Sequence, residues 1–335
     1  MVWNNHFGLP ALPPPGTFKD QTILITGASG GLGLATAIHF VNLGAASVII
    51  TARTQAKGDA AKALIEEQTR SKGKGIVKVM ELEMGTYSST KAFADRVKAE
   101  VKTIDYVLLN SGILNNKYNL GREGYEESIQ INVLSSALLG LLLLPWIKVA
   151  GKGRAHLGVV TSGRHRAVDI DGAFPQQNIL EFFSQEENFP GGQMYPISKL
   201  LEQYIVNELA KLAVGPDGTP QAIVNSMCPG LVATDLGRAY MTGPIITFFA
   251  NRVIAIVAKS SEGGARTPVL AALTTSVENG KYITHYQSDK DYKIAAEKSV
   301  FGERGQKMQA QVWKEVIGIL AEKVPEVKDI ANLVA

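Results

Sequence analysis

Two residues in the second half of the chain have the types and the spacing for proton chemistry. Tyr195 and Lys199 are four residues apart, so on a helix their side chains stand one turn from each other. A phenol with an ordinary pKa of about 10 exchanges protons poorly at neutral pH, but a neighbouring ammonium group favours the phenolate. The pair therefore suits proton transfer to or from a substrate oxygen. The same spacing also fits an amphipathic helix with the tyrosine inside and the lysine outside.

A second candidate is a glycine-rich run near the N-terminus. An apolar segment is followed by Gly27-Ala28-Ser29-Gly30-Gly31-Leu32-Gly33 and then by a helical pattern. Glycine lets the backbone turn sharply and approach a ligand closely, and the first N–H groups of a helix carry the positive end of its dipole. The run predicts a seat for the pyrophosphate of a dinucleotide at the start of a parallel sheet. A tight turn without a ligand is the alternative.

An alternation of strands and helices must position these residues. We expect strands at Thr22–Thr26, Ser47–Thr51, Ile76–Glu81, Tyr106–Asn110, His156–Thr161, Ala222–Met227 and Lys281–Thr284. We expect helices at Leu34–Leu43, Gln55–Gln68, Ser88–Lys102, Ile129–Val149, Tyr195–Ala213, Ser261–Thr274 and Glu303–Glu322. Several strands are continuous apolar runs, as in parallel strands covered on both faces. The pattern predicts an α/β fold with a single doubly wound parallel sheet of about seven strands and helices on both faces.

Composition excludes several classes of protein. Of the 335 residues, 45% are hydrophobic and 19% are charged, which is enough for a large core. The net charge of +3 gives no reason to expect a nucleic-acid partner. Cys228 is the only cysteine, which excludes an intrachain disulfide, and the histidines show no metal-ligand spacing, so no metal is predicted. The N-terminus does not resemble a signal peptide, and we expect a cytoplasmic protein.

Some segments fall outside the alternating pattern. We expect an extended proline-rich arm over 1–17, a single domain over 18–335, an insertion over 167–193, a lid over 233–260 and a C-terminal helical extension over 288–335. Long insertions beside an active site usually shape substrate access. Two apolar stretches, Ile131–Ile147 and Pro244–Ala258, are shorter than the roughly 20 residues that a membrane-spanning helix needs. Core or interface helices are favoured for both, and association with a membrane surface is not.

The glycine run and the Tyr195–Lys199 pair follow each other in an order typical of one enzyme family. The pattern Thr26-Gly27-x-x-x-Gly31-x-Gly33, followed by Tyr195-x-x-x-Lys199, resembles the short-chain dehydrogenase/reductase family. The resemblance covers Lys19 to Tyr286 and implies a Rossmann-type catalytic domain that binds NAD(P). The long gap before Tyr195 is similar to that of extended-length members, such as retinol dehydrogenases, WW-domain oxidoreductases and reductases of natural-product pathways.

The resemblance implies four catalytic residues. Tyr195 would be the general acid in carbonyl reduction, Ser162 would hydrogen-bond the substrate oxygen, and Lys199 would tune Tyr195 and hold the nicotinamide ribose. Asn132 would hold a water that leads to the lysine. An asparagine inside an apolar run is costly unless its amide is hydrogen-bonded, so the residues alone also predict a buried polar role for Asn132.

The resemblance also implies a set of cofactor-binding positions. They are Gly27, Ser29, Gly30, Gly31, Leu32, Gly33, Arg53, Glu83, Asn110, Gly112, Tyr195, Lys199, Pro229, Gly230, Val232 and Thr234. Ala52 stands where an NAD-binding member carries an acid that accepts hydrogen bonds from the ribose hydroxyls. Arg53 follows and offers a planar cation to a 2′-phosphate. NADP(H) is therefore favoured over NAD(H) as the cofactor.

The predicted activity is that of an NADP-dependent alcohol dehydrogenase or carbonyl reductase, which interconverts a ketone or aldehyde and an alcohol. Apolar residues in the insertion, among them Phe174, Phe182, Phe183 and Phe189, and in the lid predict a moderate-sized apolar substrate, such as a secondary metabolite. The same residues would also serve as core. An epimerase or cyclase without net redox change, or a non-catalytic nucleotide-binding scaffold, are the alternatives.

The helix expected over Ile129–Val149 raises the question of oligomeric state. It carries Leu138, Leu139, Leu141, Leu142, Leu143 and Leu144 and is apolar around more than one face. Such a helix is buried, either in a core or against a partner. A second subunit would cover it, and so would the chain's own insertion and C-terminal segment. A homodimer is favoured over a monomer.

Overall fold

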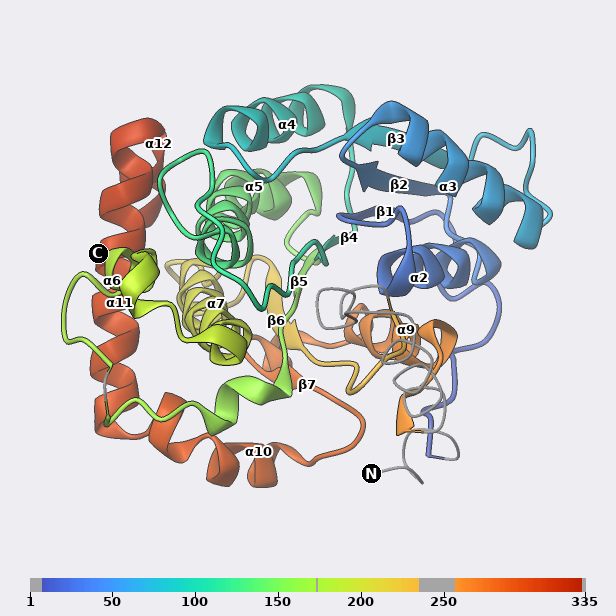
Figure 1. The fold of residues 1–335 in the computed structure, drawn as a ribbon. Coiled ribbons are helices and arrows are strands. Elements are labelled where there is room, and N and C mark those ends of the chain that lie inside the picture. The colour runs from blue at the N-terminus through green and yellow to red at the C-terminus, as the bar shows by residue number, and fades with distance from the viewer. Residues whose placement is uncertain (1–7, 173, 235–256, 333–335) are drawn as a thin grey trace, which may run out of the picture.

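A single sheet lies at the centre of the computed structural model, which describes residues 8–172, 174–234 and 257–332. Its seven strands have the order β3-β2-β1-β4-β5-β6-β7, and every neighbouring pair is parallel (Figure 1). The strands are β1 (Thr22–Ile25), β2 (Ser47–Ala52), β3 (Val77–Glu81), β4 (Tyr106–Leu109), β5 (His156–Val160), β6 (Ile223–Met227) and β7 (Tyr282–Ile283). Each lies within its predicted range or extends one residue beyond it. The predicted α/β fold is confirmed.

The order of the strands reverses in the middle of the sheet. β1 pairs with β2 on one side and with β4 on the other, so the chain returns from the β3 edge to the centre. Ligands of open α/β sheets bind at the carboxyl ends of the strands near such a switch point. The glycine-rich run follows β1 and Ser162 follows β5, so both lie at this edge of the sheet.

Helices cover both faces of the sheet. On one face are α2 (Gly31–Asn42), α3 (Gln55–Gln68) and α9 (Ser261–Ala271), and on the other are α4 (Tyr87–Glu100), α5 (Ser136–Ala150) and α7 (Met194–Leu212). Alternate residues of a strand point to opposite faces. Accordingly Ile23 and Ile25 of β1 join the core under α2 and α3, while Leu24 joins the core under α4 and α5.

Further helical segments, most of them short, fill the connections and the C-terminal region. They are η1 (Ile129–Ser135), η2 (Gly163–Ala167), α6 (Ile179–Phe182), η3 (Glu186–Asn188), η4 (Gly191–Gln193), η6 (Ser276–Glu278), α10 (Asp289–Ala295), η7 (Glu297–Phe301), α11 (Glu303–Lys323) and α12 (Glu326–Ala331). α11 matches the helix predicted over Glu303–Glu322. α11 and α12 form an outer layer beside α7 and α5, as the left side of Figure 1 shows. Their apolar residues, including Met308, Val312 and Val327, are buried in the core of that face.

The segment Ile129–Ala150 joins η1 and α5 into one continuous apolar helix. At 22 residues it is one residue longer than the helix predicted over Ile129–Val149, and by length and composition it could cross a membrane. In the fold, however, 72% of the most apolar 18-residue stretch of this helix is buried inside the protein. It is therefore a core helix, as predicted.

The N-terminal arm lies against the α2–α9 side of the domain. Phe18 is fully buried, and its ring meets Phe40 of α2 edge-on with 4.8 Å between centroids. The Gly16 N–H donates to the Leu43 carbonyl. The Arg266 guanidinium donates to the Pro10 carbonyl. The chain therefore enters β1 from a fixed position.

Candidate active site

The predicted catalytic residues Ser162, Tyr195 and Lys199 come together at the carboxyl edge of the sheet. Ser162 follows β5, and the other two occupy the first turns of α7. The Ser162 hydroxyl lies close enough to the Tyr195 phenol to lower its pKa. The Lys199 Nζ lies 5.9 Å from the centroid of the Tyr195 ring and donates to the Val160 carbonyl at 3.0 Å. The end of β5 thus presents the serine to the tyrosine and also holds the lysine.

The electrostatics of this group are set by burial. Burial raises the pKa of the Tyr195 phenol, while the Lys199 ammonium and the hydrogen bond with Ser162 lower it. Burial alone disfavours the Lys199 cation, but the Glu202 carboxylate outweighs it and the pKa of Lys199 is raised. Lys199 is therefore a firm cation next to a phenol that it favours in the ionised form.

Asn132 lies in a wide helical turn that the sequence did not reveal. We expected a regular helix from Ile129, but Ile129–Ser135 is π-helical, a geometry found mostly at functional sites. The Asn132 Oδ1 accepts from the Ile113 N–H at 2.9 Å, and its Nδ2 donates to the Ile113 carbonyl at 2.9 Å and to Ser198 Oγ at 3.0 Å. The amide is buried and hydrogen-bonded, as predicted, and it ties the segment after β4 to α7.

The glycine-rich run has the conformation expected of a ligand-binding turn. Gly27 and Gly31 have φ of +64° and +54°, which favour glycine, and a Cβ on Gly27 would lie 2.8 Å from Ser111 Oγ. Ser29 is exposed at the tip of the turn. Gly30 precedes α2, no side chain of the described residues caps that helix, and its first turn has no acid. The start of α2 therefore offers its positive partial charge to an anion.

Asn110 fixes this turn from the neighbouring strand. Its Nδ2 donates to the Thr26 carbonyl at 2.9 Å and to the Gly27 carbonyl at 3.2 Å. The Gly27 N–H donates to Thr51 Oγ1 at 3.1 Å. A Cβ on Gly33 would lie 2.6 Å from Asn110 Nδ2, so glycine is required for this contact. The Asn110 side chain thus supports the glycine-rich turn through hydrogen bonds to the backbone of that turn.

The segment after β6 lies next to the glycine-rich run. A Cβ on Gly31 would lie 3.3 Å from Thr234 Cγ2. Val232 and Leu32 meet at Gly264 of α9, where a Cβ would lie 2.6 Å from Val232 Cγ2 and 3.3 Å from Leu32 Cδ1. The structure therefore brings together two predicted cofactor segments that are 200 residues apart in the chain.

The Pro229–Gly230 turn packs on a buried basic pair that sequence reasoning missed. Gly230 has φ +82°, and a Cβ there would lie 3.1 Å from the Nζ of the fully buried Lys259. Lys259 donates to His285 Nε2 at 2.8 Å. Burial lowers the pKa of Lys259 to about 8 and that of His285 to about 4. The neutral His285 accepts a hydrogen bond from Lys259, and the pair packs against the turn.

Arg53 and Glu83, both predicted to bind the cofactor near its adenosine end, have different surroundings in the structure. Arg53 is exposed after β2. The Glu83 Oε1 accepts from the Gly85 N–H at 2.8 Å, so its carboxylate is engaged within its own loop. Glu81, the last residue of β3, was not predicted. Its Oε1 lies 2.5 Å from the Gln55 N–H at the start of α3, beside Arg53.

The Ser162 loop is held by the C-terminal extension, for which the sequence offered no signal. His165 is fully buried; its Nδ1–H donates to the Ser162 carbonyl at 2.6 Å, and its Nε2 accepts from the Tyr292 hydroxyl at 3.1 Å. Burial lowers the pKa of His165 to about 3, so the ring is neutral. Arg166 donates to the Gly163 carbonyl at 2.8 Å and to the side chain of Gln287. The loop that carries Ser162 is therefore held by residues more than 120 positions away in the chain.

The insertion over 167–193 folds against α11. The Arg304 Nε donates to the Ile170 carbonyl at 2.9 Å and pairs with Asp171 at 2.9 Å. Phe174 and Phe183 are buried, with ring centroids 4.9 Å apart. These two aromatic residues serve as core, which was the alternative to lining a substrate site. The predicted lid, with its apolar residues between Met241 and Phe249, lies mostly outside the described residues.

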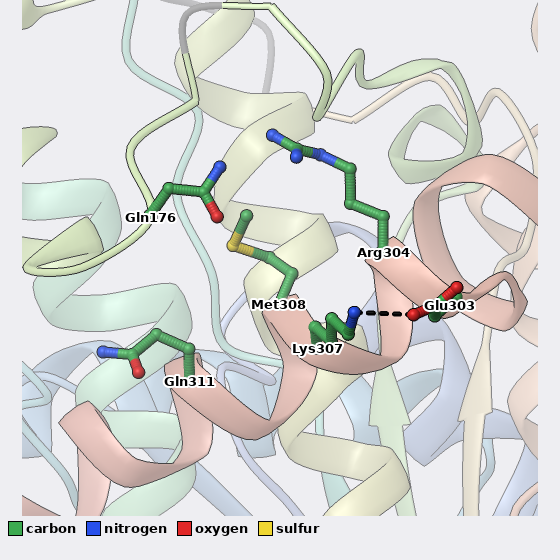
Figure 2. Close-up of a pocket in the computed structure, with 6 residues that line it drawn as sticks. All are labelled: Gln176, Glu303, Arg304, Lys307, Met308 and Gln311. Carbon is green, nitrogen blue, oxygen red and sulfur yellow. Dashed lines mark hydrogen bonds and ion pairs between the residues drawn. The ribbon is translucent and has the colours of Figure 1, made fainter.

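A surface hollow between the insertion and α11 is distinct from the catalytic group. Figure 2 shows its lining residues, which are Gln176, Glu303, Arg304, Lys307, Met308 and Gln311. Most are polar, and Lys307 and Glu303 form an exposed ion pair with each other. None of the four predicted catalytic residues lines this hollow.

The residues at the switch point fit a nicotinamide dinucleotide. The uncapped start of α2 and the glycine turn can receive a pyrophosphate. Gly112 leaves room beside the catalytic group, since a Cβ there would lie 3.5 Å from Lys199 Nζ and 3.2 Å from Asn132 Oδ1. Fold and site together define a dinucleotide-dependent oxidoreductase built on a Rossmann-type sheet.

Comparison with known proteins identifies the family. Residues 21–162 match the short chain dehydrogenase family. The short-chain dehydrogenase/reductase ffsI of Aspergillus flavipes is 32% identical, over 96% of this chain and 92% of that protein. The short chain dehydrogenase atnD of Emericella nidulans is 36% identical, over 82% and 86%. The chain therefore belongs to the short-chain dehydrogenase/reductase family of oxidoreductases.

Solved structures agree on the fold. A putative short chain dehydrogenase from Pseudomonas syringae superposes with a TM-score of 0.60 at 21% identity, covering 82% of this chain and 98% of that one. A short-chain dehydrogenase from Sphingobium yanoikuyae in complex with NADPH superposes with a TM-score of 0.52 at 18% identity, covering 75% and 83%.

Proposed function

We propose that this chain is an NADP(H)-dependent oxidoreductase that interconverts a carbonyl group and an alcohol on an apolar substrate of moderate size. The observation that carries the proposal is the Tyr195 phenol, which lies near the Ser162 hydroxyl and beside the buried Lys199 ammonium. A carbonyl that accepts hydride develops negative charge on its oxygen and needs both a proton donor and a second hydrogen bond. This group of side chains supplies both.

The protein's part in carbonyl reduction is proton transfer and orientation. A bound nicotinamide would supply the hydride to the carbonyl carbon. Tyr195 donates its phenolic proton to the oxygen, and Ser162 donates a hydrogen bond to the same oxygen. The C=O double bond becomes a C–O single bond, with a new C–H and a new O–H bond. Lys199 stabilises the phenolate that remains, and alcohol oxidation is the reverse of these steps.

The choice of NADP(H) rests on Arg53. Ala52 ends β2 without an acid, and the exposed Arg53 guanidinium follows it. A guanidinium matches the geometry of a phosphate. The apolar residues predicted in the lid support an apolar substrate, with a secondary metabolite as one candidate class. We also propose that the reaction takes place in the cytoplasm.

The test measures cofactor and turnover separately. The dissociation constants of NADPH and NADH are measured first, and a panel of ketones and alcohols is then screened by nicotinamide absorbance. We expect tighter binding of NADPH; tighter binding of NADH would reject the cofactor assignment. Conversion of a substrate without net consumption of NADPH would point instead to a redox-neutral enzyme.

Two variants test the assigned roles. Tyr195→Phe should fold and bind NADPH but lose turnover by roughly 100-fold or more, because only the transferable proton is removed. Ser162→Ala should lose less, since the tyrosine still donates to the substrate oxygen. Reductase activity close to that of the wild type in Tyr195→Phe would refute the mechanism.

A further inference from the structure

Helix α7 buries a carboxylate directly behind the catalytic lysine. Glu202 Oε2 lies 2.7 Å from Lys199 Nζ, and the two side chains are 3% and 5% exposed. Glu202 follows Lys199 by three residues, so the pair lies on one face of the helix. Burying two charges is costly, and the cost is offset only if their geometry is good. Neither the proton transfer from Tyr195 nor the binding of a pyrophosphate requires this acid.

We propose that Glu202 is a positioning residue that holds Lys199 and offsets its charge, so that the Tyr195 phenol keeps its proton to higher pH than it would beside an unpaired ammonium. The proposal rests on the function proposed above. Lys199 donates two of its three hydrogens, to Val160 and to Glu202. One hydrogen remains for a bound molecule, on the side that Gly112 keeps open.

The charges that reach Tyr195 give this proposal its sign. Burial raises the pKa of Tyr195 most, the Lys199 ammonium lowers it by favouring the phenolate, and Cys228 and Glu202 raise it further. Among the described residues, Glu202 is the only carboxylate that acts on Lys199 and on Tyr195. Without it, the full field of the ammonium would act on the phenol.

Of the other groups packed near this part of α7, Cys228 after β6 also raises the pKa of Tyr195. η1 presents the neutral Asn132, and η2 presents His165, which is neutral because burial lowers its pKa to about 3. Lys148 of α5 lies at the far end of α7, where it donates to the Leu212 carbonyl. α11 meets α7 through the neutral Gln309. Removing the Glu202 charge therefore changes a single electrostatic influence on the pKa of Tyr195.

The experiment is a titration of Tyr195 in the full chain without added cofactor or substrate. The near-ultraviolet absorbance of tyrosinate is followed with pH in wild type and in Tyr195→Phe, and the difference isolates Tyr195 from the other tyrosines. The same pair of measurements is made with Glu202→Gln, which keeps the size and the hydrogen-bond acceptor but removes the charge. We expect the Tyr195 transition to move to lower pH by about one unit. An unshifted transition, or one moved to higher pH, overturns the proposal.

A matched control lies on the same helix. Glu208 pairs with Lys211 at 2.7 Å, also three residues apart, but at the exposed end of α7. Glu208→Gln should leave the Tyr195 transition in place, and an equal shift in this variant would mean that the effect is not local to Lys199. Glu202→Asp sets the charge one methylene farther back and should give a smaller acid shift. If Glu202→Gln does not fold, an unshifted or alkaline transition in Glu202→Asp overturns the proposal.

Activity gives an independent readout. In Glu202→Gln the pH at which carbonyl reduction falls off should move down with the Tyr195 transition, because reduction needs the protonated phenol. Alcohol oxidation needs the phenolate, so its rise should also move to lower pH. A shifted titration in a protein that reduces no carbonyl would refute the proposed function and leave the tuning by Glu202 intact. An enzyme that reduces carbonyls but shows an unshifted Tyr195 titration would refute the tuning by Glu202 and leave the proposed function intact.

Discussion

At the scale of single residues, two residues of opposite charge stand at the ends of neighbouring strands, where the cofactor's adenosine end is proposed to bind. Arg53 is exposed after β2, and the Glu81 carboxylate accepts from the Gln55 N–H at 2.5 Å. The positive start of α3 is thus already engaged by an acid. A 2′-phosphate would gain from Arg53 but be repelled by Glu81, so the preference between the two cofactors reflects a balance.

Replacing Glu81 by a neutral residue should shift the preference between the two cofactors toward NADPH. Glu81→Gln removes the negative charge and keeps an acceptor for Gln55, so we expect NADPH to bind roughly 2–5-fold more tightly, as for other exposed charge pairs. The affinity for NADH should change by less, because NADH lacks the 2′-phosphate. Isothermal titration with both cofactors measures this. Arg53→Ala is the opposite control, and weaker NADPH binding in Glu81→Gln would contradict the assignment.

Sequence reasoning found the residues whose spacing is local and missed those whose partners are distant. Tyr195 and Lys199 lie one turn apart, and the glycine run is contiguous, so each carries its own signal. Glu202 is equally local, but a carboxylate three residues after a lysine usually forms an exposed pair, and only the packing of α7 shows that this pair is buried. Glu81 needed the register of β3 beside β2.

At the scale of elements, the loop that carries Ser162 is supported by α10. The Tyr292 hydroxyl donates to His165, which donates to the Ser162 carbonyl. Tyr292→Phe leaves the buried His165 Nε2 without this donor, so we expect the free energy of unfolding to fall by about 1–3 kcal/mol. Turnover should fall as the serine loop loosens, while NADPH affinity should stay within about two-fold, since the glycine turn lies on other strands. Denaturant unfolding and cofactor titration measure the two effects.

Tyr118 provides the control for this prediction. Its hydroxyl donates to the Ser184 carbonyl at 2.9 Å in the insertion, away from the catalytic serine. Tyr118→Phe should leave turnover unchanged. If Tyr292→Phe kept both the stability and the turnover of the wild type, the α10 contact would have no supporting role.

Elements were predictable where their pattern is simple. The strands are short apolar runs between helical segments, and each was placed to within a few residues. The π-helical turn at Ile129–Ser135 was not predicted, because its apolar spacing is that of an ordinary helix. Only the fold shows that Asn132 in this turn hydrogen-bonds Ile113 and Ser198. The C-terminal helices were predicted, but their place against α5 and α7 has no local signal.

At the scale of the whole molecule, the leucine-rich helix no longer calls for a second subunit. Leu138, Leu139, Leu141, Leu142, Leu143 and Leu144 are at most 2% exposed within one chain, and α12 lies against α5. Burying an exposed leucine would contribute about 1.5–3 kcal/mol, but these leucines have no exposed surface left to bury. The chain's own C-terminal segment provides the cover that the sequence left open.

We therefore expect a monomer. Light scattering across a dilution series should give the mass of one chain, 36.0 kDa, at every concentration. A mass of two chains that persists on dilution would contradict this expectation and would require an interface on a surface other than α5.

The order of the strands also determines when each strand can pair with its neighbours during synthesis of the chain. β1 lies at the centre of the sheet, yet one of its two neighbours, β4, begins 81 residues after β1 ends. At ordinary synthesis rates β4 emerges about 4–16 s later. During that interval β1 keeps an unpaired edge next to the glycine turn, a template on which another nascent chain can pair. The switch point that suits the sheet to a dinucleotide is thus also where the unfinished protein is most exposed to misassembly.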